Sequence, residues 1–201
     1  MIIRKLHETD AEKYQEIRLN ALKTDPEAFG STYEREVAFS IEHVASRIAP
    51  TKDRFVLGAL LNDELVGTAT FMRESGLKTY HKGNVFGVYV KPDYRGRAIG
   101  KALLTELIEQ AKQCEGLEQI NLAVVTVNRS AKKLYKSLGF EVYGTERNAL
   151  KFNNYYFDED LMVLKLWGIR IKIYLPFIVE GGWIEEGALT SYNLLNINSP
   201  E

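Results

Sequence analysis

The segment Arg95-Gly96-Arg97-Ala98-Ile99-Gly100 combines two arginines and two glycines within a few residues. Glycines let the backbone turn sharply and leave main-chain N–H groups open to a ligand. The apolar residues that follow, up to Ala111, have helical spacing, so the segment also contains the first unpaired N–H groups and the positive end of a helix. The sequence therefore predicts an anion-binding loop suited to a phosphate group.

A second group of residues that could do chemistry lies further along the chain. Asn128 precedes a helical pattern over residues 129–138 that Gly139 ends, and asparagine is a favoured N-cap. Tyr135 lies on this helix, where its phenol could donate a proton. It also belongs to an apolar stripe with Ala131, Leu134 and Leu138, so the residues alone leave a packing role open.

The predicted elements around these residues alternate between strands and helices. Gly87 interrupts the strand before the loop, where it indicates either a β-bulge or relief of crowding. Thr9 is the predicted N-cap of a first helix, with Glu12 completing a capping box, and Ser40 is the predicted cap of a shorter one. Strands are expected at 1–5, 54–61, 64–73, 84–90, 118–126, 140–144 and 155–166, with a hairpin turn at Asn62-Asp63.

Composition favours a globular protein of a reducing compartment. The chain has 201 residues, of which 45% are hydrophobic and 26% charged, and its net charge of -1 gives no case for binding nucleic acid or a membrane surface. No apolar run reaches membrane-spanning length and no signal-peptide pattern is present. A single cysteine, Cys114, excludes an internal disulfide and is expected to pack passively. A cytoplasmic location is expected.

The two motifs together resemble those of the GNAT superfamily of N-acetyltransferases. They read Arg95-x-x-Ala98-x-Gly100 after a hydrophobic strand, and N-x-x-A-x-x-L-Y-x-x-x-G-F from Asn128 to Phe140. The resemblance covers residues 1–166 and implies an α+β fold: a central, mixed, mostly antiparallel twisted sheet flanked by helices, with two splayed parallel strands that hold the cofactor. The family usually has glycine at the position of Ala98. We expect ordinary helical angles there, so that alanine is tolerated.

The resemblance implies acetyl-CoA as the co-substrate and no metal. It places the pyrophosphate on the loop, the pantetheine arm along the bulged strand and on Asn128, and the sulfur beside the Tyr135 hydroxyl. The cofactor-binding residues implied in this way are Val88, Val90, Arg95, Gly96, Arg97, Ala98, Ile99, Gly100, Lys101, Asn128 and Tyr135.

The resemblance also implies transfer of the acetyl group to a primary amine of a small molecule or peptide, with residues 26–38 forming one wall of the acceptor site. The substrate-contact residues expected there are Phe29, Ser31, Tyr33, Glu34 and Glu36. A non-catalytic acyl-CoA-binding or sensing module is the alternative.

The general base is not identified by the motifs. The strand 84–90 contains no acidic residue, so we predict Glu34, or a chain of water molecules, in that role. The carboxylates of residues 158–160 are expected to be solvent-exposed, and His81 is expected to be a solvated loop histidine rather than a proton shuttle. Tyr135 is the predicted general acid.

The chain is expected to divide into an acetyltransferase domain, residues 1–166, and a C-terminal extension, residues 167–201. Apolar residues alternate with polar ones from Ile169 to Leu175, which is typical of a strand. Such a strand would dock on the sheet edge or pair with a second subunit in a homodimer. A tail without fixed structure is the alternative.

Overall fold

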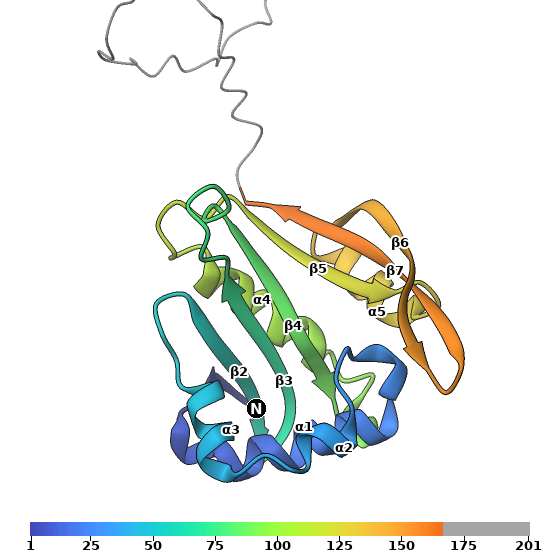
Figure 1. Ribbon diagram of the computed structural model, residues 1–201. Helices are drawn as coiled ribbons and strands as arrows, with labels where there is room; N and C mark the ends of the chain where they lie inside the picture. Colours follow the sequence, from blue (N-terminus) through green and yellow to red (C-terminus); the bar gives the residue numbers. More distant parts are fainter. Residues whose placement is uncertain (167–201) are drawn as a thin grey trace, which may run out of the picture. The chain divides into compact units, whose positions relative to one another are not determined.

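The computed structural model (Figure 1) describes residues 1–166, so the predicted C-terminal strand lies outside the described residues. Seven strands form one sheet in the order β1-β2-β3-β4-β5-β7-β6, and only the β4–β5 pair is parallel within this part of the chain. The predicted fold class is confirmed. The elements are β1 (Ile2–Lys5), η1 (Glu8–Asp10), α1 (Ala11–Thr24), η2 (Pro26–Ala28), α2 (Tyr33–Glu36), α3 (Ile41–Ile48), β2 (Arg54–Leu61), β3 (Glu64–Arg73), β4 (Lys82–Val90), η3 (Pro92–Tyr94), α4 (Ile99–Ala111), β5 (Gln119–Val125), α5 (Arg129–Ser137), β6 (Glu141–Phe152) and β7 (Tyr155–Lys165).

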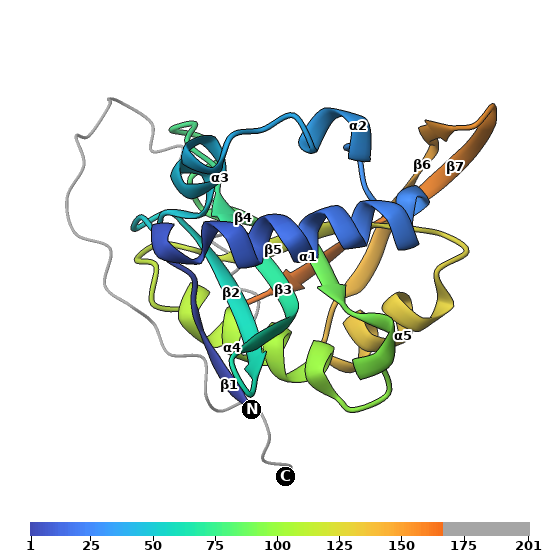
Figure 2. The ribbon, with the colours of Figure 1, turned by 90° about the horizontal axis from the view of Figure 1, so that it is seen from below.

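Helices cover both faces of the sheet (Figure 2). On one face the apolar stripe of α4, including Leu103 and Leu107, is fully buried against strand residues such as Phe71, and α5 adds Tyr135 to this cluster. On the other face Ile17 of α1 and Val44 of α3 form a second cluster with β2 and β3. The helical stripes read from the sequence are therefore the buried faces. No helix within residues 1–166 is long and apolar enough to cross a membrane.

The parallel strands β4 and β5 are joined only at one end. They pair through Lys82–Asn84 and Gln119–Asn121 and then diverge (Figure 1). Gly87 lies in the divergent part with φ +58, and the register between β3 and β4 shifts there. This shift is the β-bulge that the glycine predicted. The gap between the strands thus opens toward the end of β4 that leads into the anion-binding loop.

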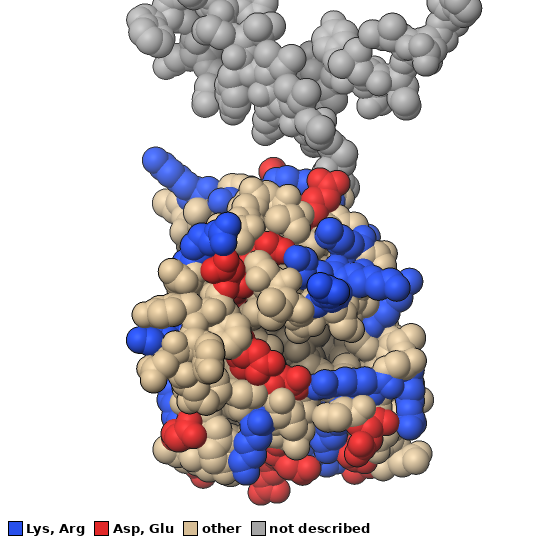
Figure 3. Space-filling view, turned by 90° about the vertical axis from the view of Figure 1, so that its right-hand side faces the viewer, with Lys and Arg blue, Asp and Glu red and all other residues tan. Residues whose placement is uncertain are grey.

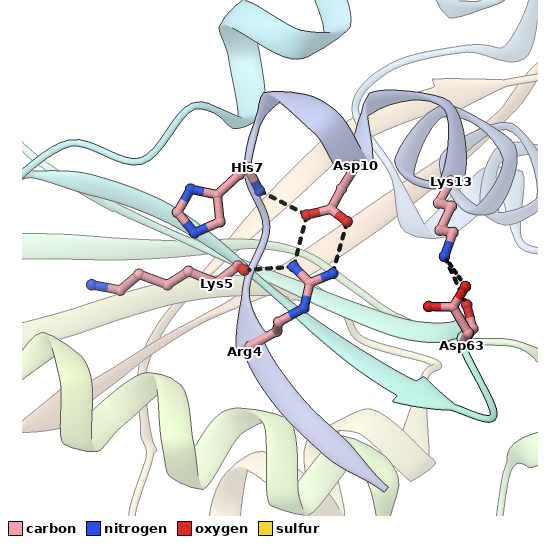
Figure 4. Close-up of polar contacts among 6 residues, drawn as sticks. All are labelled: Arg4, Lys5, His7, Asp10, Lys13 and Asp63. Atoms are coloured by element: carbon pink, nitrogen blue, oxygen red, sulfur yellow. Dashed lines mark hydrogen bonds and ion pairs between the residues drawn. The ribbon is translucent and has the colours of Figure 1, made fainter.

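The N-terminus of α1 is organised by Asp10, so the predicted N-cap, Thr9, is wrong. The helix begins at Ala11 after a 3-10 turn. The Asp10 carboxylate accepts hydrogen bonds from both terminal nitrogens of Arg4, at 2.7 and 2.8 Å, and from the His7 N–H at 2.9 Å (Figure 4). Arg4 arrives from β1, so a tertiary contact outweighs the local capping pattern.

Removing this carboxylate is expected to destabilise the fold. Asp10→Ala loses three charge-assisted hydrogen bonds, so the free energy of unfolding at pH 7 should fall by about 1–3 kcal/mol in urea titrations. The hydrogen bonds from Arg4 hold the pKa of Asp10 below its usual value, although burial opposes them. The stabilisation is therefore present above about pH 4 and is lost as the pH falls through the lowered pKa.

Lys13→Ala is the matched control, because its ion pair with Asp63 is exposed (Figure 4). It should unfold like the wild type. An equal loss in both variants, or a difference between wild type and Asp10→Ala that persists undiminished at pH 2, would contradict the assignment.

The C-terminal hairpin is longer than predicted. β6 runs from Glu141 to Phe152, whereas the sequence predicted a strand over residues 140–144. The register with β7 shifts twice along β6, and Asn148 has φ +53. These irregularities interrupt the alternation of apolar and polar residues by which strands are recognised.

Candidate active site

The loop after β4 presents a row of free backbone N–H groups. The Ala102 N–H donates to the Ala98 carbonyl at 3.0 Å, but those from Gly96 to Lys101 have no acceptor within residues 1–166. Gly96 and Ala98 both have left-handed φ angles, +76° and +59°. Successive N–H groups around such residues form the concave arrangement that binds anions. The predicted anion-binding loop therefore has the required backbone geometry.

The expectation that Ala98 has ordinary helical angles is wrong. This residue is the N-cap of α4, with φ 59° and ψ 12°. The left-handed conformation costs a residue with a Cβ atom about 1–2 kcal/mol. Alanine at this position therefore strains the backbone, whereas glycine would adopt the same angles without strain.

Ala98→Gly is accordingly expected to stabilise the protein. Relief of the strain exceeds the greater entropy that glycine gives the unfolded chain, so the free energy of unfolding should rise by about 0.5–1 kcal/mol. Acetyl-CoA affinity, measured by calorimetry, should stay the same or increase. Ala102→Gly, within the ordinary helical part of α4, is the control and should be destabilised by about 1 kcal/mol. Weaker binding by Ala98→Gly would mean that the alanine methyl group contacts the ligand.

Arg95 joins the loop to the segment that follows α1. Its guanidinium group forms an ion pair with Asp25, at 2.5 Å between Nη2 and Oδ2, and donates from Nε to the Val90 carbonyl at 2.9 Å. Arg97 lies over the Tyr94 ring, and both Arg97 and Lys101 are exposed. Arg97 and Lys101 are therefore the cations free to meet a ligand from solvent.

The bulge leaves main-chain groups of β4 outside the ladder. Thr68 pairs with Tyr89 and Thr70 with Phe86, so Gly87 and Val88 together lie opposite a single residue of β3. Val88 therefore lies in the bulged part of β4, along which the resemblance places the pantetheine arm. The Val90 carbonyl, in contrast, already accepts the Arg95 hydrogen bond.

Asn128 and Tyr135 both have the structural roles that the sequence left open for them. The Asn128 side chain accepts from the Ala131 N–H at 3.0 Å, so it is the predicted N-cap. The Tyr135 ring is 7% exposed and meets Phe140 edge-on. Its hydroxyl has no hydrogen-bond partner within residues 1–166, and burial raises the pKa of Tyr135 to about 12. The ring is a core residue whose hydroxyl keeps its proton.

A cavity of about 270 Å³ brings together four of the predicted acceptor-site residues, Phe29, Ser31, Tyr33 and Glu34. Its opposite wall is formed by Leu150–Phe152 of β6, which the sequence did not indicate as part of the site. Lysines and carboxylates share the lining: Lys23, Glu27, Glu34 and Lys151. Figure 3 shows a hollow on the β6–β7 side of the molecule, with charged side chains of both signs around it.

Glu36 does not belong to this cavity, so its prediction as a substrate contact is wrong. The residue is 4% exposed, and its carboxylate accepts from Arg18 at 2.8 and 2.9 Å, with Arg47 at 3.8 Å. Burial alone would raise the pKa of Glu36, but the bonds and charge of these arginines lower it overall. Glu36 therefore holds α2 and α3 against α1.

His81 lies away from the loop. It precedes β4, whereas the loop follows the strand, and nine residues of strand separate them by roughly 30 Å. Its place in the chain is compatible with the predicted solvated role.

The expected solvent exposure of the acidic run 158–160 is wrong. Asp160 is 7% exposed, accepts from the Thr145 hydroxyl at 2.9 Å and pairs with Lys132 at 2.5 Å. Asp158 accepts from the Asn148 N–H, and Glu159 is half-buried. The register of β7 with both its neighbours buries this run, and no local pattern marks it.

Tyr89 is a further residue that sequence reasoning missed. Its hydroxyl donates to Asn20 at 2.6 Å and lies 2.9 Å from the Thr24 hydroxyl, which fixes the end of α1 against β4. The partners are more than 60 residues apart in the chain, so spacing gives no signal for this contact.

The geometry of the loop, the gap between β4 and β5 and the burial of Tyr135 agree with the arrangement that the resemblance implies. The chain belongs to the acetyltransferase (GNAT) family, whose model matches residues 15–140. The protein is accordingly an acyltransferase of the N-acetyltransferase type.

The similar proteins include an L-amino acid N-acetyltransferase and acetyltransferases of known structure. The L-amino acid N-acetyltransferase AaaT of Escherichia coli is 27% identical over 76% of this chain and 92% of its own length. A GNAT-family acetyltransferase from Streptococcus pneumoniae has a TM-score of 0.74 at 23% identity, covering 82% and 99% of the two chains. A phosphinothricin acetyltransferase from Sinorhizobium meliloti, solved with acetyl-CoA, has a TM-score of 0.69 at 21% identity, covering 82% and 87%. The last two likenesses concern the fold.

Proposed function

We propose that the protein transfers an acetyl group from acetyl-CoA to the primary amine of a small acceptor. The observation that carries this proposal is the row of free N–H groups from Gly96 to Lys101 beside the gap between β4 and β5. The pyrophosphate would bind to this row, with Arg97 and Lys101 beside it. The pantetheine arm would follow Val88 and Asn128 toward the Tyr135 hydroxyl.

The chemistry starts with an amine that is protonated at neutral pH. Freeing its lone pair costs roughly 4–5 kcal/mol when the amine pKa is near 10. The nitrogen then attacks the thioester carbonyl, and the N–H of Val88, which lies at the bulge, would stabilise the oxyanion. Collapse of the intermediate releases the CoA thiolate, to which Tyr135 would donate a hydrogen bond.

The acceptor that the cavity supports best is an amino acid or a similar zwitterion. Lys23 and Lys151 offer cations for a carboxylate, while Glu27 and Glu34 offer anions for an ammonium group. Glu34, the base predicted from the sequence, is exposed at the cavity rim, where it is placed to attract the ammonium group. The relative AaaT is named for L-amino acids, which supports the same acceptor class.

Release of free CoA thiol, measured across L-amino acids, polyamines, aminoglycosides and short peptides, tests both parts of the proposal. Turnover should be fastest with an L-amino acid and absent with its N-acetylated form. A preference for polyamines would contradict the zwitterionic acceptor. Acetyl-CoA binding without thiol release for any amine would instead support a non-catalytic acyl-CoA-binding module.

A further inference from the structure

Glu159 lies on the acceptor side of the sheet. Asp160 and Met162 of β7 face α5 and α4, because Asp160 pairs with Lys132 and Met162 belongs to the core cluster of α4. Side chains alternate along a strand, so Glu159 faces the opposite side. This is the side of α1 and α3, whose residues form the second core cluster.

The strand register places Glu159 between the cavity and the gap. It lies opposite Val125, the last residue of β5, and is therefore at the wide end of the divergence from β4. Phe157, two residues earlier on the same face, pairs with the cavity residue Leu150. Two residues along a strand span about 7 Å. A side chain at this position is within reach of a group held in the cavity.

The carboxylate of Glu159 also lacks a bonding partner in the described part of the chain. Its neighbours Asp158 and Asp160 are hydrogen-bonded or ion-paired, whereas Glu159 has no hydrogen bond or ion pair within residues 1–166. A half-buried acid is rarely left without a partner, because desolvation disfavours its charged form. The site is thus one where a positively charged ligand would be stabilised.

The charged groups around Glu159 favour proton uptake. Glu146 of β6 is opposite it in the register, while its partner on β5 is the uncharged Val125. Arg147 is paired with Asp158, and Lys132 lies on the other face with Asp160. Burial and the Glu146 charge raise the pKa of Glu159. A carboxylate whose pKa is raised toward the working pH is a stronger base.

We propose that Glu159 is the general base that deprotonates the acceptor amine; this rests on the proposed acetyl transfer. The ammonium group gives one proton to the Glu159 carboxylate, and its freed lone pair forms the C–N bond. The C–S bond then breaks, its electron pair leaves on the sulfur, and the second proton of the nitrogen neutralises the thiolate directly or through solvent. The carboxylic acid returns its proton to water. Glu34, at the rim, attracts the ammonium group without taking its proton.

Glu159→Gln tests the proposal against two matched variants, Glu34→Gln and Glu141→Gln. Initial rates are measured with acetyl-CoA and the best amine of the screen, from pH 6 to pH 10. For Glu159→Gln we expect kcat at pH 7 to fall about 10²-fold, with the acetyl-CoA dissociation constant unchanged. The difference in kcat between wild type and Glu159→Gln should become smaller toward pH 10. It should also be smaller for acceptors whose amine has a lower pKa, because in both cases the amine binds already deprotonated.

The controls separate this role from others. Glu34→Gln should raise the acceptor KM with little change in kcat. Glu141→Gln, at an exposed glutamate at the start of β6, should stay within about threefold of wild type. Wild-type kcat in Glu159→Gln, or a deficit that is the same at every pH and for every acceptor, overturns the assignment. An inactive wild type with every amine would instead overturn the proposed function itself.

Discussion

Replacing Gly100 with valine is expected to abolish acetyl-CoA binding. Gly100 is the second residue of α4, within the row of free N–H groups. A Cβ atom there would already lie 3.3 Å from the Leu134 Cδ2 atom, so the branched side chain of valine must displace α5 or project over the groups that meet the pyrophosphate. Calorimetry should show affinity weaker by more than about 10²-fold, a loss of over ~2.7 kcal/mol.

A second substitution separates these two causes. If valine acts only by displacing α5, shortening the neighbour with Leu134→Ala should restore binding in the double variant. If valine covers the N–H groups, the double variant should remain unable to bind. Circular dichroism and the melting temperature establish that each variant is folded. Tight binding by Gly100→Val alone would contradict the anion-binding role of the loop.

Tyr135→Phe is expected to lower kcat by about 10²-fold and to leave acetyl-CoA binding within about twofold. The substitution removes only the hydroxyl, while the ring keeps its edge-on contact with Phe140. With a pKa of about 12, Tyr135 is a weaker acid than a thiol, whose pKa is near 8.5. Full proton transfer to a free thiolate would cost ~5 kcal/mol, so the hydroxyl acts by donating a hydrogen bond to the departing sulfur.

The pH profile provides a second measurement of the same role. Because Tyr135 keeps its proton up to about pH 12, its ionisation should cause no loss of activity below pH 10. A loss centred near pH 8.5 that disappears in Tyr135→Phe would contradict this assignment. Tyr143→Phe, at a tyrosine that is 60% exposed, is the control and should have wild-type kcat.

The strands, helices and motif residues that have strong local signals were predictable from the sequence. The apolar stripe of α4, the bulge at Gly87 and the caps Ser40 and Asn128 depend on near neighbours, and the structure confirms them. The capping position of α1 and the length of β6 were not predictable. The first depends on Arg4 from another element, and the second on irregular pairing with β7.

In the candidate site, too, features with a local sequence signal were predictable and features that depend on tertiary contacts were not. The loop residues could be located from their types and spacing, but the left-handed angles of Ala98 arise from the turn in which it is held. The hydrogen bond from Arg18 to Glu36 depends on how α2 packs against α1. Glu159 has no sequence signal at all, because its side of the sheet is fixed by register with β5 and β6.

The ion pair between Arg95 and Asp25 connects two binding regions that the sequence separates by about 70 residues. Arg95 opens the loop for the cofactor phosphates, and Asp25 directly precedes η2, whose residues reach the acceptor cavity. A ligand that strengthens or breaks this contact changes the free energy of both regions. By thermodynamic reciprocity, the factor by which acetyl-CoA changes acceptor affinity must equal the factor by which the acceptor changes acetyl-CoA affinity. Asp25→Asn measures how much of that coupling passes through one salt bridge.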